Sequence, residues 1–209
     1  MRPPESWNSA RLTLALTLVT AAAFALTALF RLQDWAIAWG GFIPARFAFE
    51  MQGAAAPVWL TPLTATLVHA NILHLGLNLL ILVFCGRPSE AVLGRAAIAI
   101  LYVVGAYAAA AAQYAVGPES MTQMIGASGA ISAVLGAYAV LFGRNRVKIA
   151  NPTVALMVHA LWLMAAWIGL QLIVALAAPG LGIAVAAHIG GFVAGVLLAN
   201  PLLLFRYRR

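Results

Sequence analysis

The clearest shortage in this sequence is charge. Of its 209 residues, 8% are Asp, Glu, Lys or Arg, whereas 64% are hydrophobic. Soluble globular domains carry charge on about a quarter of their residues, so the composition argues against a soluble globule. Apolar stretches of about 18 or more residues recur along the chain, and each is long enough for a membrane-spanning helix. The sequence therefore predicts an integral membrane protein without a sizeable soluble domain.

Cysteine and acidic residues are also scarce. Cys85 is the single cysteine, so an intrachain disulfide cannot shape the fold. The sequence has five acidic residues, and none falls within a predicted span. His69, His74 and His188 therefore lack the carboxylate or thiolate that would complete a usual metal site. We expect neither a metal nor another cofactor.

The basic residues outnumber the acidic ones, giving a formal net charge of +7. They form short clusters between apolar runs, which is typical of membrane topology signals and argues against nucleic-acid binding. With the N-terminus inside the cell, only Arg31 and Arg46 fall on the outer side. The inner side holds Arg2, Arg11, Arg87, Arg95, Arg144, Arg146, Lys148, Arg206, Arg208 and Arg209. The bias predicts that both termini are cytoplasmic, in a bacterial inner membrane.

The hydrophobic pattern predicts an all-α membrane protein with one six-helix transmembrane domain over residues 1–209. Pro62 suits the first turn of the second span, and Gly86, Arg87 and Pro88 are expected to end it. The long connection over residues 31–60 is rich in Trp and Phe, which favours a position in the membrane interface. The predicted spans are 12–30, 62–85, 95–115, 127–143, 153–177 and 183–204.

The first span could also be a cleaved signal peptide. Arg2 and Arg11 precede it, and Ala23-Phe24-Ala25 resembles a cleavage site. Its apolar run is longer than the usual stretch of about 7 to 15 residues, so we favour an uncleaved helix.

Polar side chains inside a span are costly and mark candidate functional sites. A helix rises about 1.5 Å per residue, which puts Ser128 about 24 Å above Arg144 and His188 about 27 Å above Arg206. Two distant spans thus place a hydroxyl and an imidazole at similar depth. The polar residues of the spans are His69, Asn71, His74, Asn78, Ser128, His159, Gln171 and His188.

The span that carries Ser128 is short. From Ser128 to Phe142 a helix covers about 22 Å, against a hydrocarbon core of about 30 Å. We therefore expect the preceding loop to dip into the membrane and Ser128 to begin the helix, where free N–H groups suit a developing oxyanion. His74 and Asn78 share one helix face and could add donors. With no carboxylate in the spans of Ser128 and His188, these two residues predict a dyad of nucleophile and base.

Small residues follow both candidate catalytic residues. Gly191 and Gly195 lie on the face of His188, at the third and seventh positions after it. Gly129, Ala133 and Gly136 form a comparable stripe after Ser128. Such stripes let two membrane helices approach closely, so the two spans can bring Ser128 and His188 together.

Four motifs resemble those of the rhomboid family of intramembrane serine proteases. Each is weak alone, but their order, spacing and position on the spans agree from about residue 12 to residue 204. The motifs are His69-x4-His74-x3-Asn78, Gly86-x3-Glu90-x3-Gly94, Gly126-Ala127-Ser128-Gly129 and Ala187-His188-x2-Gly191-x3-Gly195.

The resemblance implies a six-helix core whose water-filled active site opens outward. It implies a Ser128–His188 dyad, with oxyanion contacts from His74, Asn78 and the Ser128 backbone N–H. Transmembrane protein substrates would be cleaved near their outer ends, usually beside a small residue. The first loop would lie half-submerged in the outer leaflet.

Two positions depart from the family pattern. Many bacterial members carry an aromatic residue four positions after the nucleophile, stacked on the catalytic histidine. This chain has Ser132 there, so another group must position His188. The family's Trp-Arg pair in the first loop is also absent, because Leu60 and Thr61 follow Trp59.

The remaining candidates have simpler interpretations. His69 is interpreted as a structural residue that holds the first loop or a carbonyl, and Glu90 as one that pins the cytoplasmic loop. His159 and Gln171 are assigned to local polar partners or a cavity wall. Trp162 and Trp167 are interpreted as helix-packing or interface residues.

Two other functions compete with proteolysis. An inactive relative could bind transmembrane helices, but such proteins typically lack the serine or the histidine, and this chain has both. A small transporter would need a polar pathway through the membrane, whereas the polar residues here gather toward one side.

Overall fold

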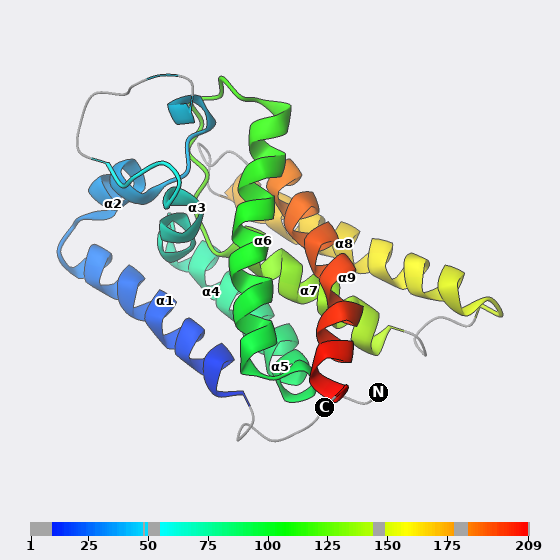
Figure 1. Ribbon diagram of the computed structural model, residues 1–209. Coiled ribbons are helices and arrows are strands. Elements are labelled where there is room, and N and C mark those ends of the chain that lie inside the picture. Colours follow the sequence, from blue (N-terminus) through cyan, green and yellow to red (C-terminus); the bar gives the residue numbers. More distant parts are fainter. Residues whose placement is uncertain (1–9, 48, 50–54, 144–148, 178–183, 209) are drawn as a thin grey trace.

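The computed structural model describes residues 10–47, 49, 55–143, 149–177 and 184–208. Its long helices surround a short helix, α7 (Ser128–Phe142), in which every residue is buried (Figure 1). Elongated apolar helices pack around a buried one only if most of them face a nonpolar solvent on their outer sides. The long helices are α1 (Arg11–Leu29), α6 (Arg95–Val116), α8 (Pro152–Ala177) and α9 (Val185–Tyr207).

The expected all-α membrane bundle is confirmed. Among the described residues, 5 helices are long and apolar enough to cross a membrane, and α7 is a shorter apolar helix between them. The only extended pairing in the described part of the chain is an isolated bridge between Phe42 and Met124. Five of the six predicted spans differ from the observed helices by at most three residues at each end.

The second span is the exception, and its predicted bounds of 62–85 are wrong. Residues from Pro62 onward form only a short helix, α3 (Thr61–Thr64), and a 3₁₀ turn, η2 (Ala65–Leu67). The long helix begins ten residues later with α4 (Ile72–Ile81), because the Asn71 side chain caps it by accepting the His74 backbone N–H at 2.8 Å.

The far end of this span is also later than predicted. Gly86, Arg87 and Pro88 do not end it, since a π-helical turn, η3 (Leu82–Gly86), leads directly into α5 (Arg87–Leu93). Pro88 occupies the first turn of α5, directly after the π-helical turn. The helix ends at Gly94, whose φ of 86° is open to glycine at little cost.

Glu90 ties α5 to the start of α1. Its two carboxylate oxygens accept the backbone N–H groups of Leu12 and Thr13 at 2.9 and 2.7 Å, and the Thr13 hydroxyl at 2.7 Å. No side chain of the α1 N-terminus itself provides a cap. A carboxylate that is 1% exposed therefore satisfies the free N–H groups of a neighbouring helix and complements its dipole.

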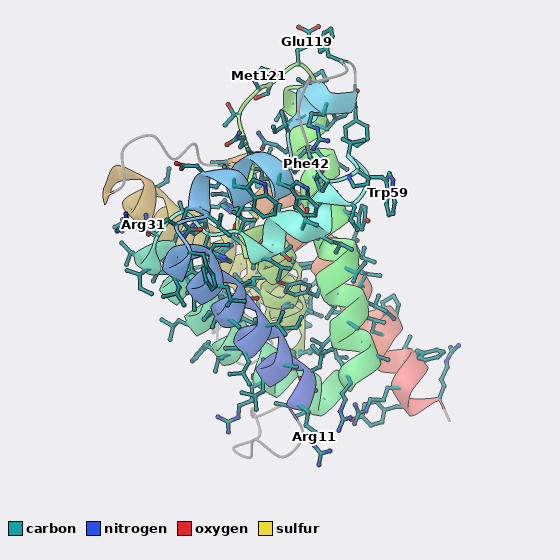
Figure 2. The ribbon with its side chains drawn as sticks, turned by 90° about the vertical axis from the view of Figure 1, so that its left-hand side faces the viewer. Arg11, Arg31, Phe42, Trp59, Glu119 and Met121 are labelled. Carbon is teal, nitrogen blue, oxygen red and sulfur yellow. The ribbon has the colours of Figure 1, made fainter. Side chains whose placement is uncertain are left out.

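The first loop contacts the bundle through backbone hydrogen bonds, the Gln33 side chain and a buried ring. It contains α2 (Gln33–Gly40) and a 3₁₀ turn, η1 (Pro44–Phe47). Phe42 is 1% exposed and packs with Ala65 and Ala110. Trp59 is exposed at the edge of the molecule, where its carbonyl accepts the Tyr107 hydroxyl at 3.0 Å (Figure 2). The immersion of this loop in the membrane interface stays a prediction.

The described cations lie mainly at one end of the bundle. Arg11 begins α1 at the end opposite Glu119 (Figure 2), and α6 begins and α9 ends on the side of Arg11 (Figure 1). The guanidinium of Arg206 packs directly over Gly94. Which end faces the cytoplasm stays a prediction. Five of the counted cations lie outside the described residues: Arg2, Arg144, Arg146, Lys148 and Arg209.

Replacing Glu90 should destabilise the fold without touching α7. In Glu90→Gln the buried carboxylate loses its charge, and at least one of its three hydrogen bonds should weaken, at a cost of about 1–3 kcal/mol. The thermal unfolding temperature in detergent should fall. Glu119→Gln, at an exposed loop position, is the matched control and should leave that temperature unchanged. Equal stability of the two variants would contradict the capping role.

Candidate active site

The structure brings Ser128 and His188 into direct contact. The Ser128 Oγ and the His188 Nε2 are 2.8 Å apart, and the two residues are 6% and 5% exposed. A hydroxyl and an imidazole at this distance can exchange a proton directly. The pair is therefore chemically able to act as a nucleophile and its base.

Ser128 is the first residue of α7 and lies in the interior of the bundle. Figure 1 shows the chain descending from the top of α6 to the middle of the bundle before α7 begins. Backbone contacts at three residues hold this descending segment. The Gly126 N–H donates to the Ala65 carbonyl at 2.9 Å, Met124 pairs with Phe42, and the Ser120 carbonyl accepts the Ala45 N–H at 3.1 Å. At Gly126 the φ is 101°, a turn for which glycine is suited.

Glycines set the distance between α7 and α9. A side chain at Gly191 would collide with the Gly129 carbonyl, and one at Gly195 with the Ala133 carbonyl. Gly136 packs against the Phe192 carbonyl of α9 in the same way. Gly129 differs from the expected stripe, because a Cβ added to it would lie 2.6 Å from the Ala109 Cβ of α6. The glycines let two backbones touch, which brings His188 to Ser128.

His69 contacts the segment just before the nucleophile. Its Nε2 accepts the Ala127 N–H at 3.4 Å, and its backbone carbonyl accepts the Gln33 side-chain amide at 3.2 Å. The ring is 1% exposed, and its centroid lies 5.1 Å from that of His74. His69 thus links the first loop, the start of α4 and the residue preceding Ser128.

The two candidate oxyanion donors lie on the inward face of α4, and only one reaches the nucleophile loop. The His74 imidazole lies against Gly126, where an added Cβ would be 2.6 Å from its Nε2. Asn78 is fully buried, and its amide donates to the His74 carbonyl of its own helix at 2.8 Å. An amide group has two N–H donors, so this bond leaves one of them for another acceptor.

Trp167 of α8 is part of the site, although the sequence assigned it to packing or the interface. Its indole N–H donates to the Ser132 Oγ at 2.8 Å, and its ring centroid lies 6.1 Å from that of His188. Ser132 in turn donates to the Ser128 carbonyl at 2.7 Å. The sequence shows a serine one turn after Ser128, but no pattern in the sequence links this serine to a tryptophan 35 positions away.

Two further candidates lie away from the dyad. Glu90 contacts the start of α1, and the His159 ring packs against Gly143 at the opposite end of α7 from Ser128. The side chain of Gln171 lies outside the described residues.

The second ring nitrogen of His188 has no polar partner among the described residues. The His188 Nδ1 is buried and makes no hydrogen bond there. In a Ser-His-Asp triad a carboxylate on this atom would hold the ring in place. The orientation of His188 must therefore come from packing, to which Gly191 and Trp167 contribute.

Comparison with known proteins points to one family. A family model described as the Rhomboid domain matches residues 57–205, a range that includes His74, Asn78, Ser128 and His188. A curated relative, the Rhomboid protease GlpG of Pectobacterium atrosepticum, is 28% identical over 190 residues, which is 90% of this chain. The chain spans 61% of that relative's length.

The glycine contact can be tested with one methyl group. In Gly191→Ala the new Cβ meets the Gly129 carbonyl, so α9 must move away from α7 and the fold should lose about 1–3 kcal/mol of stability. We expect a lower unfolding temperature and slower reaction of Ser128 with a fluorophosphonate probe. Gly169→Ala is the matched control, because nothing lies within 4 Å of its added Cβ. If both variants behave like the wild type, the close approach is not needed.

Proposed function

The chain belongs to the rhomboid family, and we propose that it is an intramembrane serine protease that cleaves transmembrane proteins. The observation that carries the proposal is the 2.8 Å contact between the Ser128 Oγ and the His188 Nε2 at the start of a buried helix. The family relative that is named a protease supports it. The resemblance of the four motifs adds the positions at which the chemistry is expected.

In the proposed mechanism Ser128 is the nucleophile and His188 the base. His188 takes the hydroxyl proton as the Ser128 Oγ attacks the peptide carbonyl, and an acyl-enzyme forms when the protonated imidazole gives that proton to the leaving amine. Water then attacks the acyl group, with His188 again acting as base. Two groups are sufficient for this cycle, provided that the imidazole is held in orientation by its surroundings.

The start of α7 suits the oxyanion of the tetrahedral intermediate. The first N–H groups of a helix have no partner within it, and the helix dipole favours negative charge at that end. The Ser128 N–H is the nearest of them. We assign additional donors to the His74 imidazole, which lies beside Gly126, and to the free amide N–H of Asn78. Donors fixed before the reaction stabilise the charge without reorganisation.

The proposed site opens to the outer side of a bacterial inner membrane. The described basic ends of α1, α6 and α9 would face the cytoplasm, which agrees with the positive-inside bias of the whole sequence. The loop that carries Glu119 and Met121 lies at the opposite end of the bundle (Figure 2), and Ser128 follows this loop as the first residue of α7. Substrates would then be cleaved near the outer ends of their transmembrane segments.

Removing either member of the dyad should abolish proteolysis. Purified wild type should cleave a transmembrane reporter substrate in detergent, and Ser128→Ala or His188→Ala should reduce the rate by at least about 10³-fold with the fold intact. A fluorophosphonate should label Ser128, and the labelling should need His188. His159→Ala, at the other end of α7, is the control for loss of an imidazole. Full activity of Ser128→Ala would exclude the mechanism, and absent labelling of folded wild type would favour a binding role.

The proposed topology can be measured with added cysteines, because Cys85 is the only native one and is buried. A thiol reagent that cannot cross membranes should label Met121→Cys in spheroplasts, since this loop residue is 60% exposed. Arg208→Cys, after α9, should react only once the membrane is permeabilised. The reverse pattern would place the site on the cytoplasmic side.

A further inference from the structure

Trp167 differs from the rest of the helix that carries it. It is 3% exposed, and among the described side chains of α8 only Ala155 is also buried. Trp162 of the same helix is 67% exposed. Burying an indole is favourable but requires a partner for its N–H, so this position has both a packing role and a polar contact.

The N–H end of the indole is fixed by Ser132. Ser132 donates its own hydroxyl proton to the Ser128 carbonyl at 2.7 Å, which leaves the Oγ lone pairs to accept the Trp167 N–H at 2.8 Å. Ser132 is fully buried, so water does not compete for these bonds. Linked hydrogen bonds in a low-dielectric interior strengthen each other. The indole is therefore held on the same helical turn that begins with the nucleophile.

The ring end of the indole faces His188. The two ring centroids are 6.1 Å apart and the planes are inclined by 60°, a tilted arrangement within the usual range for aromatic pairs. With the His188 Nδ1 unpartnered among the described residues, this contact is the one aromatic restraint on the imidazole there. The indole thus touches the base with its ring and the nucleophile's helix with its N–H.

We infer that Trp167 is the positioning residue of the base, and that Ser132 sets the angle of its indole. The inference rests on the proposed dyad of Ser128 and His188. By occupying the space beside the imidazole, the ring restricts rotation that would take the Nε2 away from the Ser128 Oγ. A misplacement of about 1 Å in such a pair can cost about 100-fold in rate, so a packing contact can control reactivity.

The small size of Ser132 also contributes to the placement of the Trp167 indole. Its Cβ would lie 3.2 Å from a Cβ added to Gly191, so this turn of α7 faces α9 closely. A large side chain at this position would take the space next to His188 that Trp167 now fills. The serine therefore both leaves room for the indole and provides the acceptor that orients it.

The test compares variants of both ends of the contact in the full-length protein in detergent. Trp167→Ala removes the ring, Trp167→Phe keeps a ring without the N–H, and Ser132→Ala removes the acceptor. The double variant Trp167→Phe with Ser132→Ala completes a cycle, and Trp162→Ala is the matched control on the exposed face of α8. For each, the rate of Ser128 labelling by a fluorophosphonate and the kcat and KM for a transmembrane reporter are measured well below its unfolding temperature.

We expect Trp167→Ala to lower the labelling rate and kcat by about tenfold or more, with KM changed by less than about twofold, because the orientation of the base is lost but substrate contacts are not. Trp167→Phe and Ser132→Ala should each lose less. The double variant should lose no more than the larger single loss, because both changes break the same Trp167–Ser132 hydrogen bond and Ser132→Ala alone also removes the bond to the Ser128 carbonyl. Trp162→Ala should match wild type.

Three results would overturn the inference: wild-type labelling in Trp167→Ala, an equal loss in Trp162→Ala, or additive losses in the cycle. If Trp167→Ala fails to fold, the labelling rates of Trp167→Phe and Ser132→Ala still test the inference. Wild type that shows no His188-dependent labelling would instead refute the proposed dyad, which separates the two failures.

Discussion

The contact between α7 and α9 is the constraint on which the rest of the structure depends. At Gly191 and Gly195 the backbone of α9 lies against the carbonyls of Gly129 and Ala133, a distance that a single Cβ would increase. Lipid provides no hydrophobic drive between two apolar helices, so van der Waals contact of this kind must hold them together. The same contact puts His188 at the level of Ser128. Packing and site geometry are therefore one feature of the fold, and the glycines that stabilise the bundle also set the 2.8 Å between the Oγ and the Nε2.

Because α7 begins inside the bundle, polar backbone groups are buried there, and surrounding residues provide them with hydrogen-bond partners. The first N–H groups of α7 and the loop before it need partners where water is scarce. Contacts to residues 124–127 come from Phe42 of the first loop and from Ala65 and His69, which precede α4. These bonds hold the chain up to Ser128, and in the proposed mechanism the N–H groups at the start of α7 are left for the reacting carbonyl. Three of the four histidines that were predicted to be costly within the spans, His69, His74 and His188, thus lie around the N-terminus of α7.

Much of this arrangement could be predicted from the sequence because its causes are local. Apolar run lengths predicted an all-α bundle, and a fixed rise per residue placed Ser128 and His188 at one depth. The second span was wrong at both ends because turn signals were read without their context: Pro62 sits in a short separate helix, and Pro88 lies within the first turn of α5 after a π-helical turn. The hydrogen-bond partners of Glu90 and Trp167 could not be predicted. They depend on how each helix is rotated about its axis and on which helices are neighbours, and the spacing of residues in the sequence determines neither. The glycine stripes indicated which helices could touch but not which third helix would pack beside them.

If Trp167 orients His188 as proposed, the departure from the family motif at Ser132 need not remove the function. An imidazole without a carboxylate partner must be held in place by a rigid neighbouring side chain. That side chain can come from any helix that packs beside the imidazole. Here the fourth position after the nucleophile has become a hydrogen-bond acceptor, and the ring that contacts His188 belongs to α8. If that ring orients the base, the docking of α8 and the alignment of the dyad are a single event. Since Ala155 and Trp167 are the buried side chains of the described part of α8, a helix that is as little buried as α1 would then have a direct effect on the reactivity of Ser128.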